Sequence, residues 1–315
     1  MRTLLPQMGK KARNADLDVS LFCSYFNQCK SLTMMQKNLP VMMAIGCFMA
    51  FSLISFAQRA DSLNFDGYCI NPWASGSIVA VGVVSNVIGQ PRLNDRPPLS
   101  DATLQRVAAS RVNSFDSWAL RQDAGRRGEA HETSDIMLYS SLFLPAALFL
   151  DKEIRHDWAP VALLYLEAQS VNTMLYAWGP FGPTLVTRYR PAVYYEELPT
   201  EGRNFGGMRN SFYSGHVGST ATSTFFTARV LADYHPEWGG KRALLYGIAA
   251  LPPALVGYFR IRALRHFPSD VLVGGLVGAT VGILTPEIHT RCHGKVGFSA
   301  IYSRELKSLG LVCRL

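Results

Sequence analysis

Three short clusters in this sequence contain residue types that together could bind and cleave a phosphate ester. They read Arg-Tyr-Arg-Pro at 188–191, Tyr-Ser-Gly-His at 213–216 and, at 260–270, a segment with three arginines, a histidine and an aspartate. Arginine forks bind phosphate oxygens in pairs and stay charged at any working pH. Histidine titrates near neutrality and can serve as a nucleophile or a proton donor. The clusters therefore predict an oxyanion site.

The residue types also suggest roles. His266 could attack phosphorus, with Asp270 one helical turn away to hold its tautomer and stabilise the imidazolium. His216 could then protonate the leaving oxygen. The predicted phosphate ligands are Arg188, Arg190, Arg260 and the backbone amides of Ser214 and Gly215, which open an apolar run and so offer free N–H groups at a helix start. This inventory needs no metal and no cofactor.

In this order, the clusters resemble the motifs of the type 2 phosphatidic acid phosphatase superfamily, which includes class A acid phosphatases and vanadium haloperoxidases. That family carries Lys-x6-Arg-Pro, Pro-Ser-Gly-His and Ser-Arg-x5-His-x3-Asp. The matches are Arg190-Pro191, then Ser214-Gly215-His216, then Arg260, His266 and Asp270. The resemblance spans about residues 134–286 and implies a helical core and a phosphohistidine intermediate on His266.

Three positions depart from the family pattern. Pro183 stands where the first motif has its Lys, Tyr213 replaces the Pro before Ser-Gly-His, and Phe259 replaces the Ser before Arg260. Because the family's Lys contacts phosphate, another cation is expected to supply that charge. Arg188 is the preferred substitute, and the weaker candidates are Arg209, Arg262 and Arg265.

Six apolar runs must position these clusters: 74–89, 136–150, 158–178, 217–231, 244–258 and 271–284. Each has about helix length, and the last three are rich in small residues, as close helix packing in lipid requires. Strand signals are sparse. The predicted fold is all-α, a polytopic membrane helical bundle, with 134–286 as the phosphatase core and 287–315 as a C-terminal tail.

Topology follows from the order of runs and clusters. The first two clusters follow run 158–178 and the third follows run 244–258, so two runs separate them and all three share one face. The basic tail predicts a cytoplasmic C-terminus by the positive-inside rule, which places the site on the periplasmic side of a bacterial inner membrane. A cleaved signal together with a spanning run 74–89 would invert the site. Run 74–89 is short and broken by polar residues, so we expect it not to cross fully when the signal is removed.

The first 57 residues have the features of a leader. Segment 34–57 has the charge, apolar and small-residue order of a secretory signal peptide, which predicts a mature N-terminus at Gln58 and a start codon at Met34 or Met35 rather than Met1. The alternative is an uncleaved anchor at 40–57. Residues 58–133 form a polar or amphipathic segment between the leader and the core.

Composition narrows the function. The 315 residues include 31 Lys+Arg and 23 Asp+Glu, with 48% hydrophobic and only 17% charged residues. Losing the leader would remove six basic and two acidic residues and leave a net charge of +4, which does not indicate nucleic-acid binding. His131, His156, His235, His289 and His293 show no ligand spacing and are expected at the surface.

The sequence thus predicts a membrane-bound, metal-independent phosphatase whose partner is a phosphorylated lipid among membrane lipids. Phosphatidic acid, phosphatidylglycerol phosphate, undecaprenyl diphosphate and lipid A phosphates all present the same reacting group. Two alternatives stay open. One is a soluble periplasmic acid phosphatase or vanadate-dependent haloperoxidase, and the other is an inactive lipid-binding scaffold. The sequence does not predict an oligomeric state.

Overall fold

The computed structural model describes residues 68–290 and the strands 297–303 and 308–314, all within one compact unit, Leu53–Leu315. The predictions on the leader, on Gln58 and on His293 concern residues outside these ranges. The long helical segments are α2 (Pro72–Asn94), α4 (Arg127–Phe143) with η3 (Leu144–Leu150), α6 (Trp158–Trp178), α7 (Gly215–Tyr234), α8 (Arg242–Ala249) with α9 (Leu251–Arg262), and α10 (Pro268–Thr290).

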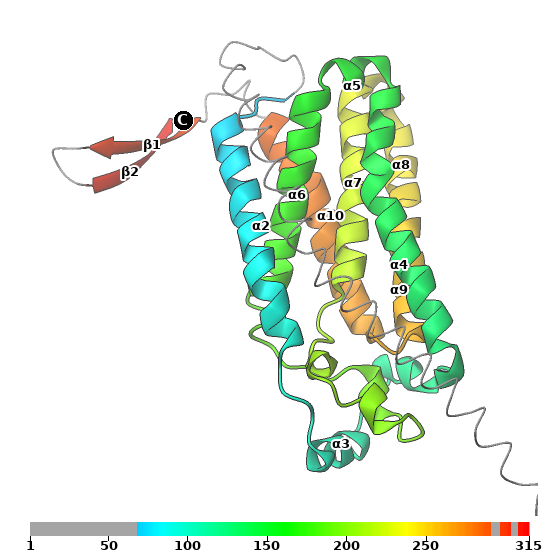
Figure 1. Ribbon diagram of the computed structural model, residues 1–315. Helices are drawn as coiled ribbons and strands as arrows, with labels where there is room; N and C mark the ends of the chain where they lie inside the picture. Colours follow the sequence, from blue (N-terminus) through cyan, green and yellow to red (C-terminus); the bar gives the residue numbers. More distant parts are fainter. Residues whose placement is uncertain (1–67, 291–296, 304–307, 315) are drawn as a thin grey trace, which may run out of the picture. The chain divides into compact units, whose positions relative to one another are not determined.

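These segments run side by side as a bundle of six rods, each built on one of the six predicted apolar runs (Figure 1). The predicted helical membrane fold is therefore confirmed. A two-stranded antiparallel hairpin, β1 (Gly297–Ser303) and β2 (Ser308–Arg314), follows the bundle in the predicted tail. The sparse strand signals gave no indication of this hairpin.

Short elements connect the rods. The α2–α4 connection holds α3 (Asp101–Ala108), η1 (Asp116–Arg121) and η2 (Ala124–Arg126), and the α6–α7 connection holds η4 (Pro191–Tyr194), η5 (Thr200–Gly202) and η6 (Gly206–Arg209). Both connections lie at the end of the bundle where α10 begins (Figure 1). At the other end are α5 (Lys152–His156) and η7 (Pro236–Lys241). All three sequence clusters therefore meet at one end, as predicted.

Among the described residues, four helical segments are long and apolar enough to cross a membrane: 72–93, 124–150, 236–262 and 268–290. Their outer faces expose large apolar side chains, including Val84, Ile136, Phe143, Leu244, Leu255, Leu276 and Ile288. Helix α2 extends beyond the apolar run 74–89 at both ends, helped by Asn71, whose side chain caps the first turn, so the helix is longer than the run suggested. Whether it crosses fully after removal of a signal stays a prediction.

Helix α7 lies at the centre of the bundle and packs against α4, α6, α8, α9 and α10. It is in close contact with α10 through a stripe of glycines at every fourth position: Gly274, Gly278 and Gly282. A Cβ built on Gly278 would lie 2.1 Å from the carbonyl oxygen of Gly218, which no real side chain tolerates. The expected use of small residues for close helix packing is confirmed here.

This contact gives a prediction about stability. Gly278→Val should force α7 and α10 apart, because its Cβ meets backbone rather than a movable side chain. We expect a loss of several kcal/mol, comparable to a severe overpacking defect, seen as a large drop in melting temperature in detergent. Gly275→Val is the matched control, since its Cβ would lie 3.7 Å from a Val217 methyl group. Equal melting temperatures for the two variants would contradict the prediction.

Candidate active site

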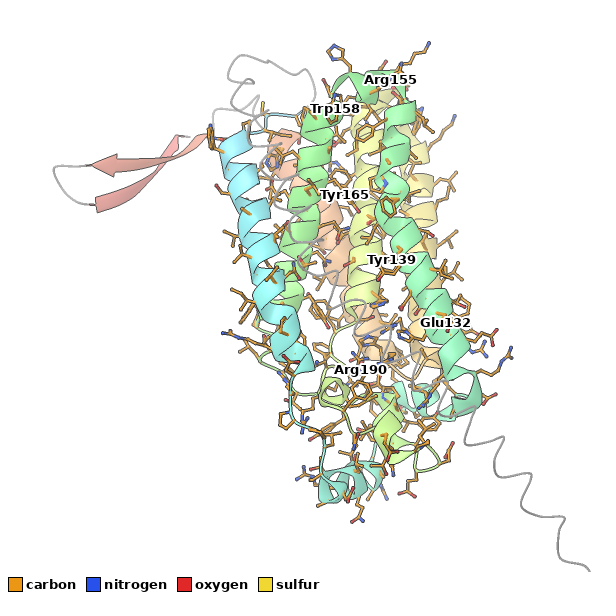
Figure 2. The ribbon with its side chains drawn as sticks, in the orientation of Figure 1. Glu132, Tyr139, Arg155, Trp158, Tyr165 and Arg190 are labelled. Atoms are coloured by element: carbon orange, nitrogen blue, oxygen red, sulfur yellow. The ribbon has the colours of Figure 1, made fainter. Side chains whose placement is uncertain are left out.

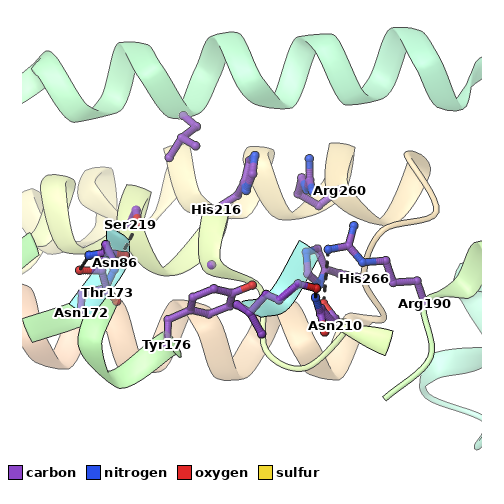
Figure 3. A pocket seen from close by; sticks show the side chains of 13 residues that line it. Asn86, Asn172, Thr173, Tyr176, Arg190, Asn210, His216, Ser219, Arg260 and His266 are labelled. Atoms are coloured by element: carbon purple, nitrogen blue, oxygen red, sulfur yellow. Dashed lines mark hydrogen bonds between the residues drawn. The ribbon is translucent and has the colours of Figure 1, made fainter. Parts of the chain in front are cut away.

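The three clusters surround one cavity of about 270 Å³ at the loop end of the bundle. Arg190, His216, Arg260 and His266 all line it, together with Gly215. Figure 3 shows these side chains gathered at one end of the cavity, on elements far apart in the sequence. Figure 2 places Arg190 at the end of the bundle opposite Trp158. The structure thus brings together most of the site residues that were predicted from the sequence.

His266 is buried and held in one orientation. Its Nδ1 lies 2.6 Å from the carbonyl oxygen of Ser211, so Nδ1 carries the proton and donates it to that carbonyl. This leaves Nε2 as the unprotonated nitrogen at the cavity. Burial, and then the nearby Arg190 and Arg260, lower the pKa of His266 well below its usual range. The imidazole is therefore neutral and available as a nucleophile.

A chain reversal brings His266 back beside Arg260. Helix α9 ends at Arg262, and two residues later Leu264 has a φ of 56°, in the left-handed region. The Arg265 amide then donates to the carbonyl of Arg260. This hydrogen bond closes a six-residue turn and is typical of the Schellman motif at a helix end. Glycine usually occupies such a position, and a buried Leu264 holds it here by packing into the core beneath the loops.

The direct contact expected between Asp270 and His266 is not among the hydrogen bonds of the described residues. Asp270 Oδ2 instead accepts from the Ser211 hydroxyl (2.6 Å) and from the Phe267 amide (2.8 Å). The carbonyl of the same Ser211 accepts the hydrogen bond of His266. Asp270 therefore positions His266 indirectly, through Ser211. An aspartate at the start of α10 reaches the loop amides beside it more easily than the imidazole four residues earlier.

Arg188 does not line the cavity. Its guanidinium pairs with Asp270, and it also donates to Asp116 Oδ2 (2.7 Å) and to the Ser269 hydroxyl (2.8 Å). The sequence analysis expected Arg188 to replace the family's Lys at the phosphate. Two buried carboxylates, Asp116 and Asp270, neutralise it here. The Arg188 side chain therefore points to the residues behind the site and not into the cavity.

Asp116 is a site residue that the sequence analysis missed. It is 1% exposed, lies in η1 of the α2–α4 connection, and accepts from Arg188, Asn113 and both the amide and the hydroxyl of Ser269. Burial alone would raise the pKa of Asp116, but these hydrogen bonds hold it below its ordinary value. The signal was weak, because a single aspartate in a polar stretch of mixed charge has no spacing that marks it.

His216 pairs with a second missed residue. Its Nε2 lies 2.9 Å from Asp135 Oδ1, and Nδ1 makes no hydrogen bond with the described residues. Asp135 also receives Arg260 Nη1 (3.3 Å), which in turn lies 3.0 Å from His131 Nδ1. His131 therefore contacts an arginine of the site, while its side chain stays 36% exposed. The separation of four residues between His131 and Asp135 was a helical pairing signal.

The three other described histidines also have acidic partners, and His156 lies 3.3 Å from Asp157. His235 lies between Asp151 (3.0 Å) and Glu237 (2.9 Å), and His289 lies 3.6 Å from Glu167. Their side chains are 17% and 15% exposed, so both are mostly buried, whereas His156 is 88% exposed as expected.

The helix start at 214–215 differs in part from expectation. The Ser214 amide donates to the Asp270 carbonyl at 3.0 Å, so it is not available to a phosphate. Gly215 lines the cavity, and its amide belongs to the first turn of α7. A Cβ on Gly215 would lie 3.1 Å from the ring of Tyr176, so glycine permits this close approach.

Arg190 and Arg260 lie close to His266, and Arg265 lies close to both of these arginines. Arg190 Nε and Arg260 Nε are buried and have no hydrogen-bond partner in the described structure. Arg190 makes only a 3.4 Å contact to the Asn210 carbonyl. Burial, followed by Arg190 and Arg260, lowers the pKa of Arg265 well below its usual value. Such an arrangement requires an anion to satisfy it.

Two of the other candidate cations, Arg209 and Arg262, are already engaged. Arg209 donates to the carbonyls of Pro97 and Pro98, and Arg262 packs over the Tyr258 ring. Arg265 contacts the Phe205 ring face at 5.9 Å, and no hydrogen bond of its guanidinium is present in the described region. Among the described residues, no three His, Cys, Asp or Glu side chains group as metal ligands, and metal independence stays a prediction to be tested.

The lowered pKa of His266 predicts a loss of stability in mild acid. The unfolded chain protonates this histidine near pH 6.5, whereas the folded chain resists it, so folding becomes less favourable as the pH falls from about 7 toward 5. The slope from one such group is at most about 1.4 kcal/mol per pH unit. Melting temperatures measured from pH 7 to pH 5 should fall less in His266→Asn than in the wild type, and parallel curves would contradict this.

A buried neutral histidine beside two arginines, with a second histidine paired with a carboxylate, is the arrangement that the sequence analysis predicted for a phosphate site in a helical bundle. The PAP2 superfamily model matches residues 140–293, which confirms the resemblance drawn from the motifs. The chain is similar to this superfamily over just under half of its length, and this similarity and the site indicate a phosphoric ester hydrolase with a membrane-protein fold.

Two solved structures resemble the chain. The crystal structure of Aquifex aeolicus LpxE is 23% identical and covers 57% of this chain and 98% of its own, with a TM-score of 0.37. The first transmembrane PAP2 type phosphatidylglycerolphosphate phosphatase from Bacillus subtilis is 19% identical and covers 76% of this chain and 94% of its own, with a TM-score of 0.32. No curated protein sequence matches the chain.

Proposed function

We propose that the protein removes a terminal phosphate from a lipid head group through a phosphohistidine on His266. The observation that carries this proposal is that two arginines, each with a buried and unpartnered Nε, line the same cavity as His266, whose Nε2 is unprotonated. Arg190, Arg260 and the Gly215 amide bind the phosphoryl oxygens. Arg265 is the best remaining candidate for the charge of the missing Lys, and Arg188 becomes a positioning residue for Asp270.

The reaction follows from the two histidines. His266 Nε2 attacks phosphorus while the bond from phosphorus to the ester oxygen breaks, and His216 gives its proton to that oxygen. Water then attacks the phosphohistidine, His216 takes a proton from it, and the N–P bond breaks to release phosphate. Asp135 accepts the Nε2–H of His216, so the proton that moves is carried on Nδ1.

The position of the cavity supports a lipid substrate. Its lining includes Leu93 of α2 and Leu138 of α4. Helix α2 packs on α6, whereas α4 packs on α7 and α9. A head group could therefore reach the cavity between α2 and α4 while its chains stay among lipids.

The test is phosphate release by purified protein from a panel of lipid phosphates, with and without EDTA. We expect release that EDTA does not reduce. Loss of turnover that Mg²⁺ restores would overturn the metal-free mechanism. Release from soluble phosphate esters but from no lipid would favour the acid phosphatase, and halide oxidation with vanadate would favour the haloperoxidase.

We further propose that the site faces the periplasm, which restricts the leader. The Cys69 amide donates to the His289 carbonyl at 3.0 Å, so the start of α2 and the end of α10 lie together, opposite the site. If all six rods cross, cleavage at Gln58 would put this end, and the tail, in the periplasm. A periplasmic site and a cleaved signal then exclude each other.

The charge of the tail supports the periplasmic site. The tail after α10 is basic, as the positive-inside rule expects of a cytoplasmic segment, whereas the connections at the site end are rich in arginine and do not add to this support. Green fluorescent protein fused after Leu315 should therefore fluoresce. Alkaline phosphatase activity from the equivalent fusion, without fluorescence, would place the tail outside and contradict this orientation.

A further inference from the structure

Tyr176 lies in the last turn of α6 and lines the cavity together with the arginines and histidines of the site. Its phenol is close enough to Arg190 and Arg260 to interact electrostatically with both guanidiniums. Figure 3 shows the ring reaching from α6 into the cavity, with the hydroxyl directed away from the helix. The phenol is therefore beside the groups that bind the phosphate in the proposed reaction.

The Tyr176 hydroxyl is open to the cavity. It makes no hydrogen bond with the described residues, and unlike the hydroxyls of Tyr213 and Ser214 it is not closed off by surrounding atoms. A phenol can donate one hydrogen bond, whereas arginine offers no acceptor. The neighbouring guanidiniums therefore cannot accept the phenol proton, but an anion that they bind can.

The ring of Tyr176 is held by its neighbours. The Tyr213 ring meets it edge-on, with centroids 5.6 Å apart and an interplanar angle of 80°. Gly215 lies so close that a Cβ there would be 3.1 Å from the Tyr176 ring. Tyr213 stands where the family motif has Pro, so this departure supplies the aromatic contact that positions Tyr176.

A second departure leaves a contact to be filled. Pro183 occupies the position of the family's Lys, and Arg188 pairs with two carboxylates behind the site. Arg265 can add positive charge, but it does not line the cavity. A hydrogen bond to a phosphoryl oxygen must come from the cavity wall, where Tyr176 offers an uncommitted donor seven residues before Pro183.

We infer, on the basis of the proposed function, that Tyr176 is a further catalytic residue whose hydroxyl donates a hydrogen bond to a non-bridging oxygen of the phosphoryl group. It replaces the contact of the absent Lys with a neutral donor. The phenol keeps its proton throughout, so proton transfer stays with His216 and bond formation to phosphorus stays with His266. Because the ring is fixed before the substrate binds, this hydrogen bond needs no reorganisation during the reaction.

The test is Tyr176→Phe, which removes the hydroxyl and keeps the ring. A hydrogen bond to a charged group corresponds to about ten- to hundredfold, so kcat/KM should fall by that factor on a lipid phosphate and equally on an aryl phosphate. Inhibition by inorganic phosphate should weaken about tenfold or more, which a purely structural role would not cause. Phosphate inhibition equal to that of the wild type would overturn the inference, and so would a loss confined to the lipid, which would place the hydroxyl at the head group. Both outcomes leave the phosphatase function standing, whereas no release by the wild type from any substrate would overturn that function.

Tyr165→Phe is the matched control. Tyr165 lies on the same helix, outside the cavity lining, and its hydroxyl contacts the Leu142 carbonyl and Ser223. This variant should keep the phosphate inhibition of the wild type. If Tyr176→Phe does not fold, 3-fluorotyrosine at position 176 of the full chain reports the contact directly. Its ¹⁹F resonance should shift at a phosphate concentration that fully inhibits turnover, whereas the same probe at position 165 should not shift, and an unmoved resonance at 176 would overturn the inference.

Discussion

Replacing His266 by asparagine is expected to abolish turnover, lowering kcat by about 10⁴-fold or more, as loss of a nucleophile does in covalent catalysis. Asparagine keeps the approximate shape and a donor toward the Ser211 carbonyl, so the fold should persist. Rapid acid quenching with a ³²P-labelled substrate should show a phosphoenzyme in the wild type and none in the variant. Labelled phosphoenzyme in His266→Asn would refute this assignment.

His216→Asn is the natural comparison, because it removes proton donation but not the nucleophile. Its rate should fall by about 10²–10⁴-fold on a lipid monoester and much less on an aryl phosphate with an acidic phenol, which leaves without a proton. Equal losses on both substrates would show that His216 does not protonate the leaving oxygen.

Arg190→Ala and Arg188→Ala are expected to fail in different ways. Arg190 faces the cavity, so its loss should reduce kcat/KM about 10²–10³-fold and weaken inhibition by inorganic phosphate, with little effect on the melting temperature. Arg188 pairs with Asp116 and Asp270, which are 1% and 0% exposed, so its loss leaves two buried carboxylates without their cation. Breaking such a pair costs about 3–5 kcal/mol and should lower the melting temperature strongly.

Asp116→Asn combined with Arg188→Gln provides the control. Removing both charges of one pair should restore part of the stability that Arg188→Gln alone loses, because fewer buried charges are left unpaired. If Arg188→Ala instead keeps its melting temperature and loses inhibition by phosphate, Arg188 contacts the phosphate directly, as the sequence analysis expected.

Local sequence signals predicted the architecture well for a physical reason. Each rod is built on an apolar run, and the glycines of α10 are spaced at one face of a helix, so both are readable along the chain. The same holds for Arg190, His216, Arg260 and His266, whose motifs lie at the ends of those runs. Because an even number of apolar runs separates these motifs, they could be predicted to lie at the same end of the bundle.

The supporting residues could not be read in this way. Asp116 and Asp135 meet Arg188 and His216 only through folding, across 72 and 81 residues of chain. The orientation of Arg188 depends on which carboxylates lie behind it, and no spacing records that. The length of α2 was underestimated because its polar caps and last turn lie outside the apolar run that was counted.

The polarity of the central helices has a consequence for biogenesis. Helices α6 and α7 are long enough to cross a bilayer, but among the described helices they are not in the apolar group, since they carry buried groups such as Glu167, Asn172, Thr220 and Thr224. Insertion of either helix alone from the translocon into lipid is therefore less favourable than insertion of an apolar helix. The glycine stripe that receives α7 belongs to α10, the last rod to be synthesised. In a chain truncated before residue 268, α7 should therefore lack its packing partner α10. We expect such a chain to be degraded faster by membrane proteases than the full chain.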